Sequence, residues 1–232
     1  MLRIVDVTKR FAANGVRTSE LVLDQASFTV EQGQVVGFTG KSGAGKSTIA
    51  RIICGMIPPD AGEVFYNDER LVSPKQAFPK HLRREIQMIP QQPMSALDPR
   101  QRIGDSICEP LLCHGIAKTK NEAKTMALHL LEHVWLEPEI AMRYPSQVSG
   151  GQAQRVVIAR ALGLTPRMLI ADESTSMLDI PAQAQVISLL KKLVTESGIS
   201  ILLISHDKPL VKALADKVYH LNNAKLELET QS

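Results

Sequence analysis

A glycine-rich segment near the N-terminus has the residue types needed to hold phosphate. GKSGAGKST occupies residues 40–48 and fits the pattern G-x-x-x-x-G-K-[ST]. Glycines let backbone amides curl around a phosphate, Lys46 supplies a point charge for its oxygens, and Ser47 offers a hydroxyl to Mg²⁺. The dinucleotide pattern G-x-G-x-x-G fails, because Thr48 stands where its third glycine would be. We therefore predict a phosphate-binding loop rather than a simple glycine turn, made of Gly40, Lys41, Ser42, Gly43, Ala44, Gly45, Lys46, Ser47 and Thr48.

Two adjacent carboxylates end the apolar stretch MLIADE at residues 168–173. Neighbouring side chains on a strand point to opposite faces, so Asp172 and Glu173 should differ in role. Asp172 suits Mg²⁺, directly or through water, and Glu173 suits the attacking water as a base. For an isolated Asp-Glu pair the alternative is a solvated strand end.

Two further polar residues follow predicted strands. Gln91 lies where a strand gives way to loop, and a glutamine there can hold a metal-bound water and report on a γ-phosphate. His206 would emerge at the carboxyl edge of the sheet, where open α/β folds bind ligands. It could contact the same phosphate, or it could be a polar residue of a strand-to-helix turn.

The segment VSGGQAQR, residues 148–155, has the features of a second anion site. Ser149 can cap a helix, and the amides behind it would attract an anion. Taken alone, the Gly-Gly pair also fits an ordinary turn.

Strands and helices alternate at both ends of the chain. Apolar or alternating patterns predict strands at 2–7, 21–30, 35–40, 63–71, 84–90, 167–172 and in SILLISHD at 200–207. They predict helices at 46–56 and 182–194 and a helix capped by Asp207. Residues 103–162 are mostly helical in pattern, with interruptions near Pro138 and Pro145. We predict an α/β fold: a core at 1–91 and 165–232 with an inserted helical subdomain at about 92–164.

Composition limits the classes of function. The chain has 232 residues, 44% hydrophobic and 22% charged, and a net charge of +3, which is too weak to indicate nucleic acid as a partner. Three cysteines at irregular spacing fit a reducing compartment. No apolar run approaches the roughly 18 residues of a membrane-spanning helix, and Asp6 interrupts any export signal, so we expect a protein that does not cross a membrane itself.

Together these motifs resemble the ATP-binding cassette (ABC) ATPase family over nearly the whole chain. Residues 40–48 resemble its Walker A motif, 148–152 its signature, 168–173 its Walker B motif and 176–179 its D-loop, while Gln91 and His206 stand at the Q-loop and switch-histidine positions. The resemblance implies a P-loop NTPase core with an N-terminal antiparallel β subdomain and an α-helical signature subdomain. It also implies that Phe11 stacks on adenine and that Val16 adds an apolar edge.

The resemblance gives the second anion site a role. In this family two nucleotide-binding domains face head to tail, and the signature of one closes over the ATP held by the other. The residues expected to reach the partner's nucleotide are Ser149, Gly150, Gly151, Gln152 and Asp179. The implied cofactors are ATP and Mg²⁺, with Ser47, Gln91 and Asp172 as metal ligands and Glu173, His206 and Gln91 as catalytic residues.

A narrower resemblance concerns QQPMSALDPRQRIGDSICEPL, residues 91–111, which is similar to the Q-loop region of the dipeptide, oligopeptide and nickel importer branch. It implies an ATPase of a membrane importer for peptide, nickel or metal-chelate substrates, peripheral on the cytoplasmic face of the inner membrane. The implied partners are a second ATPase, two permease subunits and, indirectly, a solute-binding protein. Val148 and Ser174 depart from the usual Leu and Pro. The alternatives are a soluble ABC-type ATPase acting on nucleic acid or the ribosome, and a small-molecule kinase.

Two other pairs could suggest metal binding. His129 and His133 share a helical spacing but lack the H-E-x-x-H pattern, and Cys108 and Cys113 are separated by about 140° around a helix. We expect neither pair to bind a metal.

Overall fold

The computed structural model describes residues 1–12, 19–76, 78–175 and 178–229. The chain divides into two compact units. The first combines residues 1–83 with 198–232, and the second comprises residues 84–197. Each unit is built from segments whose hydrophobic pattern matches its secondary structure.

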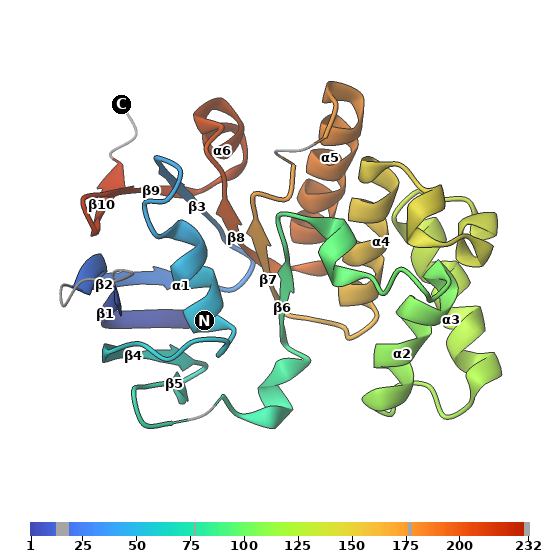
Figure 1. Cartoon of the computed structure of the whole chain (residues 1–232), viewed down its shortest axis with the longest axis horizontal. Coiled ribbons are helices and arrows are strands. Elements are labelled where there is room, and N and C mark those ends of the chain that lie inside the picture. The colour runs from blue at the N-terminus through green and yellow to red at the C-terminus, as the bar shows by residue number, and fades with distance from the viewer. Residues whose placement is uncertain (13–18, 77, 176–177, 230–232) are drawn as a thin grey trace. The chain divides into compact units, whose positions relative to one another are not determined.

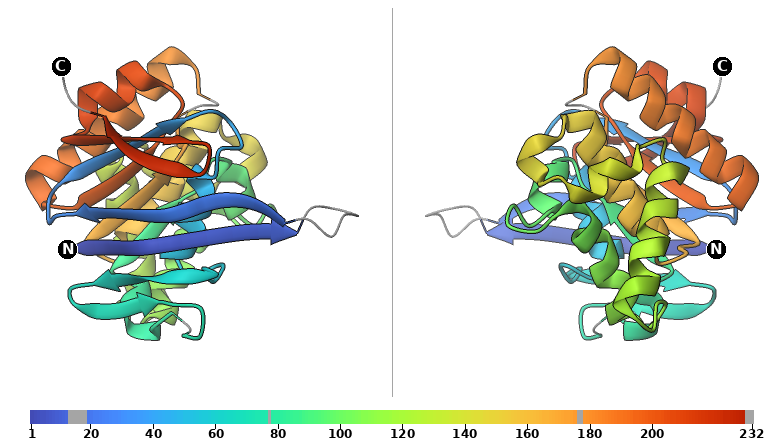
Figure 2. Two further views of the ribbon diagram at one scale, coloured as in Figure 1. Left: turned by 90° about the vertical axis from the view of Figure 1, so that its left-hand side faces the viewer. Right: turned by 90° about the vertical axis from the view of Figure 1, so that its right-hand side faces the viewer.

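The first unit contains an antiparallel sheet with the order β2-β1-β4-β5. Its two longest strands lie side by side (blue in Figure 2, left), with Leu2 opposite Val30, and the other neighbour of Leu2 is Tyr66. All three side chains are buried, so this register places one face of the sheet in the core. The strands are β1 (Leu2–Ala12), β2 (Ser19–Val30), β4 (Ala61–Tyr66) and β5 (Glu69–Val72).

A second group of strands in this unit carries the phosphate loop. β3 is parallel to β8 and β9, and β10 pairs with β9 in antiparallel fashion. Every residue of β3 and β8 is buried, as the continuous apolar patterns predict for strands covered on both faces. The strands are β3 (Val35–Gly40), β8 (Ser200–Ile204), β9 (Lys217–Asn222) and β10 (Lys225–Glu229).

Two helices of the first unit follow β3 and β8. These are α1 (Lys46–Ile53) and α6 (Lys208–Leu214), and a short 3₁₀ turn, η1, spans Lys80–Arg83. α6 packs so closely on β3 that a Cβ at Gly37 would lie 2.2 Å from Val211 Cγ1. Asp207 caps α6 by accepting a 3.0 Å hydrogen bond from the Leu210 amide, as predicted.

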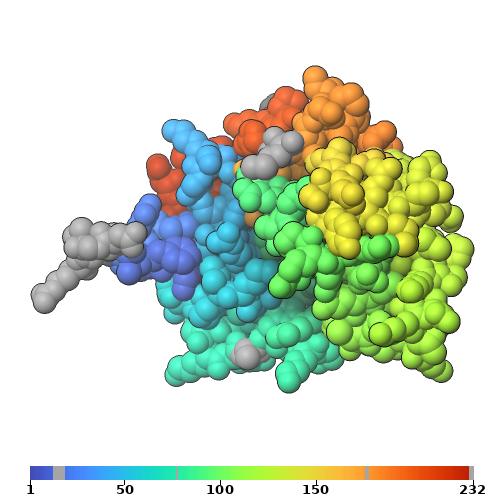
Figure 3. Space-filling view, turned by 45° about the vertical axis from the view of Figure 1, so that its right-hand side comes forward, coloured from blue at the N-terminus to red at the C-terminus, as the bar shows by residue number. Residues whose placement is uncertain are grey.

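In its described residues, the second unit contains two parallel strands and four helices. β6 (Ile86–Ile89) pairs with β7 (Met168–Asp172), with Ile86 opposite Met168. The helices are α2 (Ile103–Cys113), α3 (Lys120–His133), α4 (Gly150–Leu162) and α5 (Ile180–Ser197), with 3₁₀ turns η2 (Pro93–Ala96), η3 (Pro138–Met142) and η4 (Pro145–Gln147). α2, α3 and α4 pack against one another (Figure 1) and form one continuous surface, green to yellow in Figure 3.

The expected α/β class is confirmed, with an antiparallel N-terminal sheet and a helical insertion. The predicted interruptions at Pro138 and Pro145 are the starts of η3 and η4. The second unit is wider than the helical segment predicted at 92–164, because β6, β7 and α5 also fall within it. Within the described ranges, no helix has the length and apolar character needed to cross a membrane.

Candidate functional site

The phosphate loop joins β3 to α1, and its lysine is folded inward. Lys46 is only 4% exposed, and its Nζ donates hydrogen bonds of 2.9 Å to the carbonyl oxygens of Gly40 and Lys41. These carbonyls hold the ammonium against the loop. A positive charge is thereby fixed beside the start of α1, whose first turn contains no acidic residue.

Two glycines give the loop its shape. Gly43 has φ +78° and Gly45 has φ +105°, backbone conformations that residues other than glycine rarely adopt. A Cβ on Gly45 would lie 2.5 Å from Val22 Cγ1, whereas one on Gly43 would meet nothing within 4 Å among the described residues. Gly45 is needed for close packing, and Gly43 keeps the exposed side of the loop open. This shape fits a phosphate at the positive end of α1.

The carboxylates belong to the second unit, at the end of β7. Asp172 is buried, with 4% exposure, and it ends the strand. Glu173 has φ +46°, so it lies in the left-handed region. The strand ends at Asp172, so the strand alternation used to assign the two side chains different roles does not extend to Glu173, whose backbone is left-handed instead.

Gln91 lies next to Glu173 after the neighbouring strand β6. Its Nε2 donates a 2.7 Å hydrogen bond to Glu173 Oε2. Because β6 and β7 are parallel, their carboxyl ends meet at one edge, and residues 82 positions apart come into contact there. Of the three residues predicted to be catalytic, the structure therefore brings Gln91 and Glu173 into direct contact.

The remaining predicted residues of the first unit lie on several elements. Ser47 is in the first turn of α1, and His206 is exposed in the turn between β8 and α6. Phe11 is 41% exposed near the end of β1, and Lys9 Nζ lies 5.5 Å from its ring centroid. Val16 lies outside the described residues.

Lys9 is itself held by an ion pair. Its Nζ donates a 2.9 Å hydrogen bond to Asp60 Oδ1, and the Arg10 amide donates to Asp60 Oδ2 at 2.6 Å. These bonds, first that from Lys9, hold the pKa of Asp60 below its usual value. Asp60 thus fixes the end of β1 that carries Phe11.

The signature segment, residues 148–152, forms the capped N-terminus of α4 (Gly150–Leu162). Ser149 Oγ accepts from the Gln152 amide at 3.2 Å, and Gln152 Oε1 accepts from the Ser149 amide at 3.0 Å. This reciprocal pair is a capping box, and it confirms Ser149 as the N-cap of α4. Ser149 and Gly150 are exposed, so the positive end of α4 is open to solvent.

Unlike Gly150, Gly151 is buried, where α4 packs against Ala182 of α5. A Cβ at this position would lie 2.6 Å from Ala182 Cβ on α5, whereas one on Gly150 would meet Leu178 at an ordinary 3.7 Å. The two glycines of the motif therefore differ: Gly151 allows α4 to approach α5.

Asp179 has a local role at the start of α5. Its Oδ1 accepts a 2.9 Å hydrogen bond from the Ala182 amide, as a helix N-cap does. The two residues before Leu178 lie outside the described residues, so the structure describes only part of the predicted D-loop.

Two arginines of α4 fasten the signature helix and were missed by the sequence prediction. Arg155 Nη1 donates to the carbonyl oxygen of Trp135 at 2.7 Å, just beyond α3, and Arg160 Nη1 donates to that of Ala96 in η2. Burial lowers the pKa of both guanidinium groups. The available signal was their place inside the apolar run RVVIARAL, where a charge must find partners.

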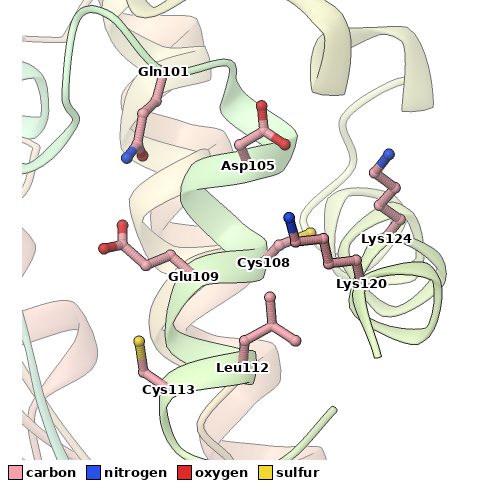
Figure 4. Close-up of a pocket in the computed structure, with 8 residues that line it drawn as sticks. All are labelled: Gln101, Asp105, Cys108, Glu109, Leu112, Cys113, Lys120 and Lys124. Atoms are coloured by element: carbon pink, nitrogen blue, oxygen red, sulfur yellow. The ribbon is translucent and has the colours of Figure 1, made fainter. Parts of the chain in front are cut away.

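A hollow of about 540 Å³ lies between α2 and α3, apart from the nucleotide motifs (Figure 4). Cys108 is buried, and burial raises the pKa of its thiol, with Asp105 adding to the effect. Cys113 is exposed, and the two sulfur atoms point to different sides of α2 in Figure 4.

His129, the first residue of the histidine pair on α3, forms an ion pair with a carboxylate. Its Nδ1 lies 3.5 Å from Glu132 Oε2, and both side chains are exposed.

Comparison with known proteins places these motifs in a family. The sequence pattern of the family described as ABC transporter matches residues 23–176. The glutathione import ATP-binding proteins GsiA of Pectobacterium atrosepticum and Escherichia coli K12 are each 41% identical over 223 residues, 94% of this chain. The chain spans only 36% of the length of these relatives. Their description agrees with the predicted resemblance to the peptide and nickel importer branch, which is confirmed.

Two solved structures have folds similar to that of this chain. The dimeric ATP-binding cassette MJ0796 in a post-hydrolysis state with ADP and Pi has a TM-score of 0.87 and 29% identity, covering 98% of this chain and 97% of the other. A second dimeric structure of the MJ0796 cassette has a TM-score of 0.86. The motifs, their order and these similarities agree, and the chain belongs to the ABC transporter family.

Proposed function

We propose that this chain is the ATP-hydrolysing subunit of an ABC importer. The observation that carries the proposal is that one chain contains both a phosphate loop with a buried lysine and an exposed, serine-capped helix start at Ser149. A single ATP needs only one such anion site. The glutathione import relatives and the dimeric cassettes support the proposal.

ATP binds through the loop at 40–48. Lys46 exchanges its bonds to the Gly40 and Lys41 carbonyls for the β- and γ-phosphates, and the open side of Gly43 admits the phosphate oxygens. Phe11 stacks on adenine. Ser47, Asp172 and Gln91 offer the hydroxyl, carboxylate and amide oxygens that Mg²⁺ prefers, and the ion would neutralise charge on the phosphates.

Glu173 acts as the base for hydrolysis. It accepts a proton from water as the water oxygen bonds to the γ-phosphorus and the bond to the bridging oxygen of ADP breaks, giving ADP and phosphate. Glu173 Oε2 accepts from Gln91 in the structure. Gln91 thus orients the carboxylate at rest, and His206 senses the γ-phosphate.

The exposed signature completes the site of a partner chain. Ser149, Gly150 and Gln152 reach its γ-phosphate, Gly151 sets the position of α4 against α5, and Asp179 fixes the start of α5. The partner is a second ATPase, with two permeases as membrane partners on the cytoplasmic face of the inner membrane. Peptide, nickel or metal-chelate compounds are the proposed class of cargo.

The Glu173→Gln variant tests this proposal. It should bind Mg-ATP but lose about 10²- to 10⁴-fold in turnover, the usual contribution of a general base. With Mg-ATP it should form a stable dimer, with itself or with a second ATPase subunit, measurable by light scattering during size exclusion. Unchanged steady-state hydrolysis would overturn the role of Glu173. Failure to associate with either partner under Mg-ATP would overturn the two-chain site.

A further inference from the structure

Within the described residues, the last part of β1 pairs with a neighbouring strand on one side only. β1 pairs with β4 as far as Thr8, which lies opposite Ala61, whereas its pairing with β2 continues to Ala12. Phe11 therefore lies beyond the last residue of β1 that β4 supports. On that side the contacts to this end of β1 come from Asp60, the residue before β4.

Asp60 is fixed to the backbone of β1 and holds Lys9. Its amide donates a 2.9 Å hydrogen bond to the Thr8 carbonyl oxygen, and its Oδ2 accepts from the Arg10 amide at 2.6 Å. Its Oδ1 accepts from Lys9 Nζ at 2.9 Å. Because two main-chain bonds set the position of the carboxylate, the ammonium that it pairs with is also held in one place.

The ammonium of Lys9 lies over the ring of Phe11. The distance from Nζ to the ring centroid is 5.5 Å, and a cation within about 6 Å of a ring face is attracted to it. Lys9 is only 9% exposed, whereas Phe11 is 41% exposed. Lysine is rarely so buried unless it is paired, and here it has a carboxylate on one side and a ring on the other. One face of an otherwise exposed ring is thereby occupied.

The ring of Phe11 lies on the face of the sheet that meets the phosphate loop. Phe11 is opposite Glu20 of β2, and Val22 is two residues further along that strand. Opposite residues share a face, and so do residues two apart along a strand. Val22 contacts the loop, since a Cβ on Gly45 would lie 2.5 Å from Val22 Cγ1. A nucleotide held by the loop would therefore find Phe11 on the same face.

We propose that Lys9, held by Asp60, is a positioning residue that presents the free face of Phe11 to adenine. The inference rests on the proposed stacking of Phe11 on the base. Ordering an exposed side chain when a ligand binds costs conformational entropy, and a ring that is already held loses less. Lys9 thus raises the affinity for ATP without touching the nucleotide.

The test is to measure the binding of ATP and of inorganic tripolyphosphate, both without Mg²⁺, to the full chain by calorimetry. Lys9→Met should weaken ATP binding roughly two- to fivefold, the size of an exposed cation–π contact, and leave tripolyphosphate binding unchanged because that ligand has no base. Lys9→Arg keeps the charge and should restore the affinity for ATP. Lys212→Met removes a lysine that lies 3.9 Å from Glu229, and it should change neither affinity.

A double-mutant cycle shows whether Lys9 acts through the ring. Phe11→Ala should weaken ATP binding, and Lys9→Met should have no further effect in that background. An equal loss from Lys9→Met with and without Phe11 would overturn the proposal, because Lys9 would then act without the ring. An equal loss of ATP and tripolyphosphate binding would also overturn it, since the change would then be a general structural one.

Failure of this inference can be told apart from failure of the proposed function. If the wild-type protein hydrolyses ATP and Lys9→Met binds ATP as the wild type does, the positioning role is wrong and the proposed function stands. If the wild-type protein binds neither ATP nor tripolyphosphate, both are wrong.

Discussion

Gln91 Nε2 donates a 2.7 Å hydrogen bond to Glu173 Oε2, which joins the ends of two parallel strands. An amide donor fixes the orientation of the carboxylate and occupies one of its oxygens. The proposed base is therefore held in place before any nucleotide arrives, and the residue that holds it is also the proposed reporter on the γ-phosphate.

Gln91→Ala should lower kcat for ATP roughly two- to tenfold, because Glu173 loses the bond that orients it. The affinity for ATP without Mg²⁺ should change less, because the phosphate loop belongs to the other unit and Gln91 is proposed to reach the nucleotide only through the metal. Steady-state kinetics would measure kcat. Titration with a fluorescent ATP analogue would measure the affinity. Gln185→Ala, an exposed glutamine on α5, is the matched control. An equal loss in both variants would contradict the positioning role of Gln91.

The glycines of the phosphate loop should differ in their tolerance of a Cβ. Gly43→Ala carries only the cost of a left-handed backbone, about 1–2 kcal/mol, because nothing described lies within 4 Å of the added atom. Gly45→Ala should cost a further 1–3 kcal/mol, because its Cβ would lie 2.5 Å from Val22 Cγ1 and 2.9 Å from the Val22 carbonyl oxygen. Urea unfolding measures both changes. Equal stability of the two variants would disprove the packing role of Gly45.

Ser149 caps a helix and has a proposed role across the dimer. A comparison with Thr119, which only caps a helix, can distinguish the two roles. Thr119 Oγ1 accepts from the Glu122 amide at 3.1 Å and caps α3, as Ser149 caps α4. Ser149→Ala and Thr119→Ala should each cost about 1 kcal/mol of stability. Only Ser149→Ala should also reduce ATP hydrolysis by the assembled dimer. If Thr119→Ala reduced hydrolysis equally, the effect would be one of stability alone.

Asp60 should make a pH-dependent contribution to stability. Its folded pKa is lowered, chiefly by the hydrogen bond from Lys9, so the stabilisation is fully present above the unfolded value of about 3.9 and is lost as the pH falls through the folded pKa. The carboxylate side chain is 45% exposed, so the effect should stay below about 1 kcal/mol.

Urea unfolding of the wild type and Asp60→Asn across pH measures this contribution. The difference between them should be constant from about pH 5 to 8 and shrink below about pH 4. Glu227→Gln, on an exposed residue of β10, removes the same charge without that ion pair. A difference for Asp60→Asn that grew at acid pH would refute the sign of the shift.

The sequence alone determined the features that depend on a few consecutive residues. The phosphate loop follows from its glycine spacing, the caps at Ser149 and Asp207 follow from a polar residue before a helical pattern, and the buried strand at 35–40 follows from its unbroken apolar run. In each case the hydrogen bonds or the periodicity that define the element are local, so one segment contains the whole signal.

The tertiary structure decided which distant residues touch. Glu173 turns into the left-handed region and meets Gln91, Gly151 lies against Ala182, and Arg160 reaches the Ala96 carbonyl. No local pattern encodes such pairs, because they depend on which strands become neighbours and how closely two helices pack. The sequence thus named the chemical groups of the site, and only the packing of β6, β7, α4 and α5 determined their contacts.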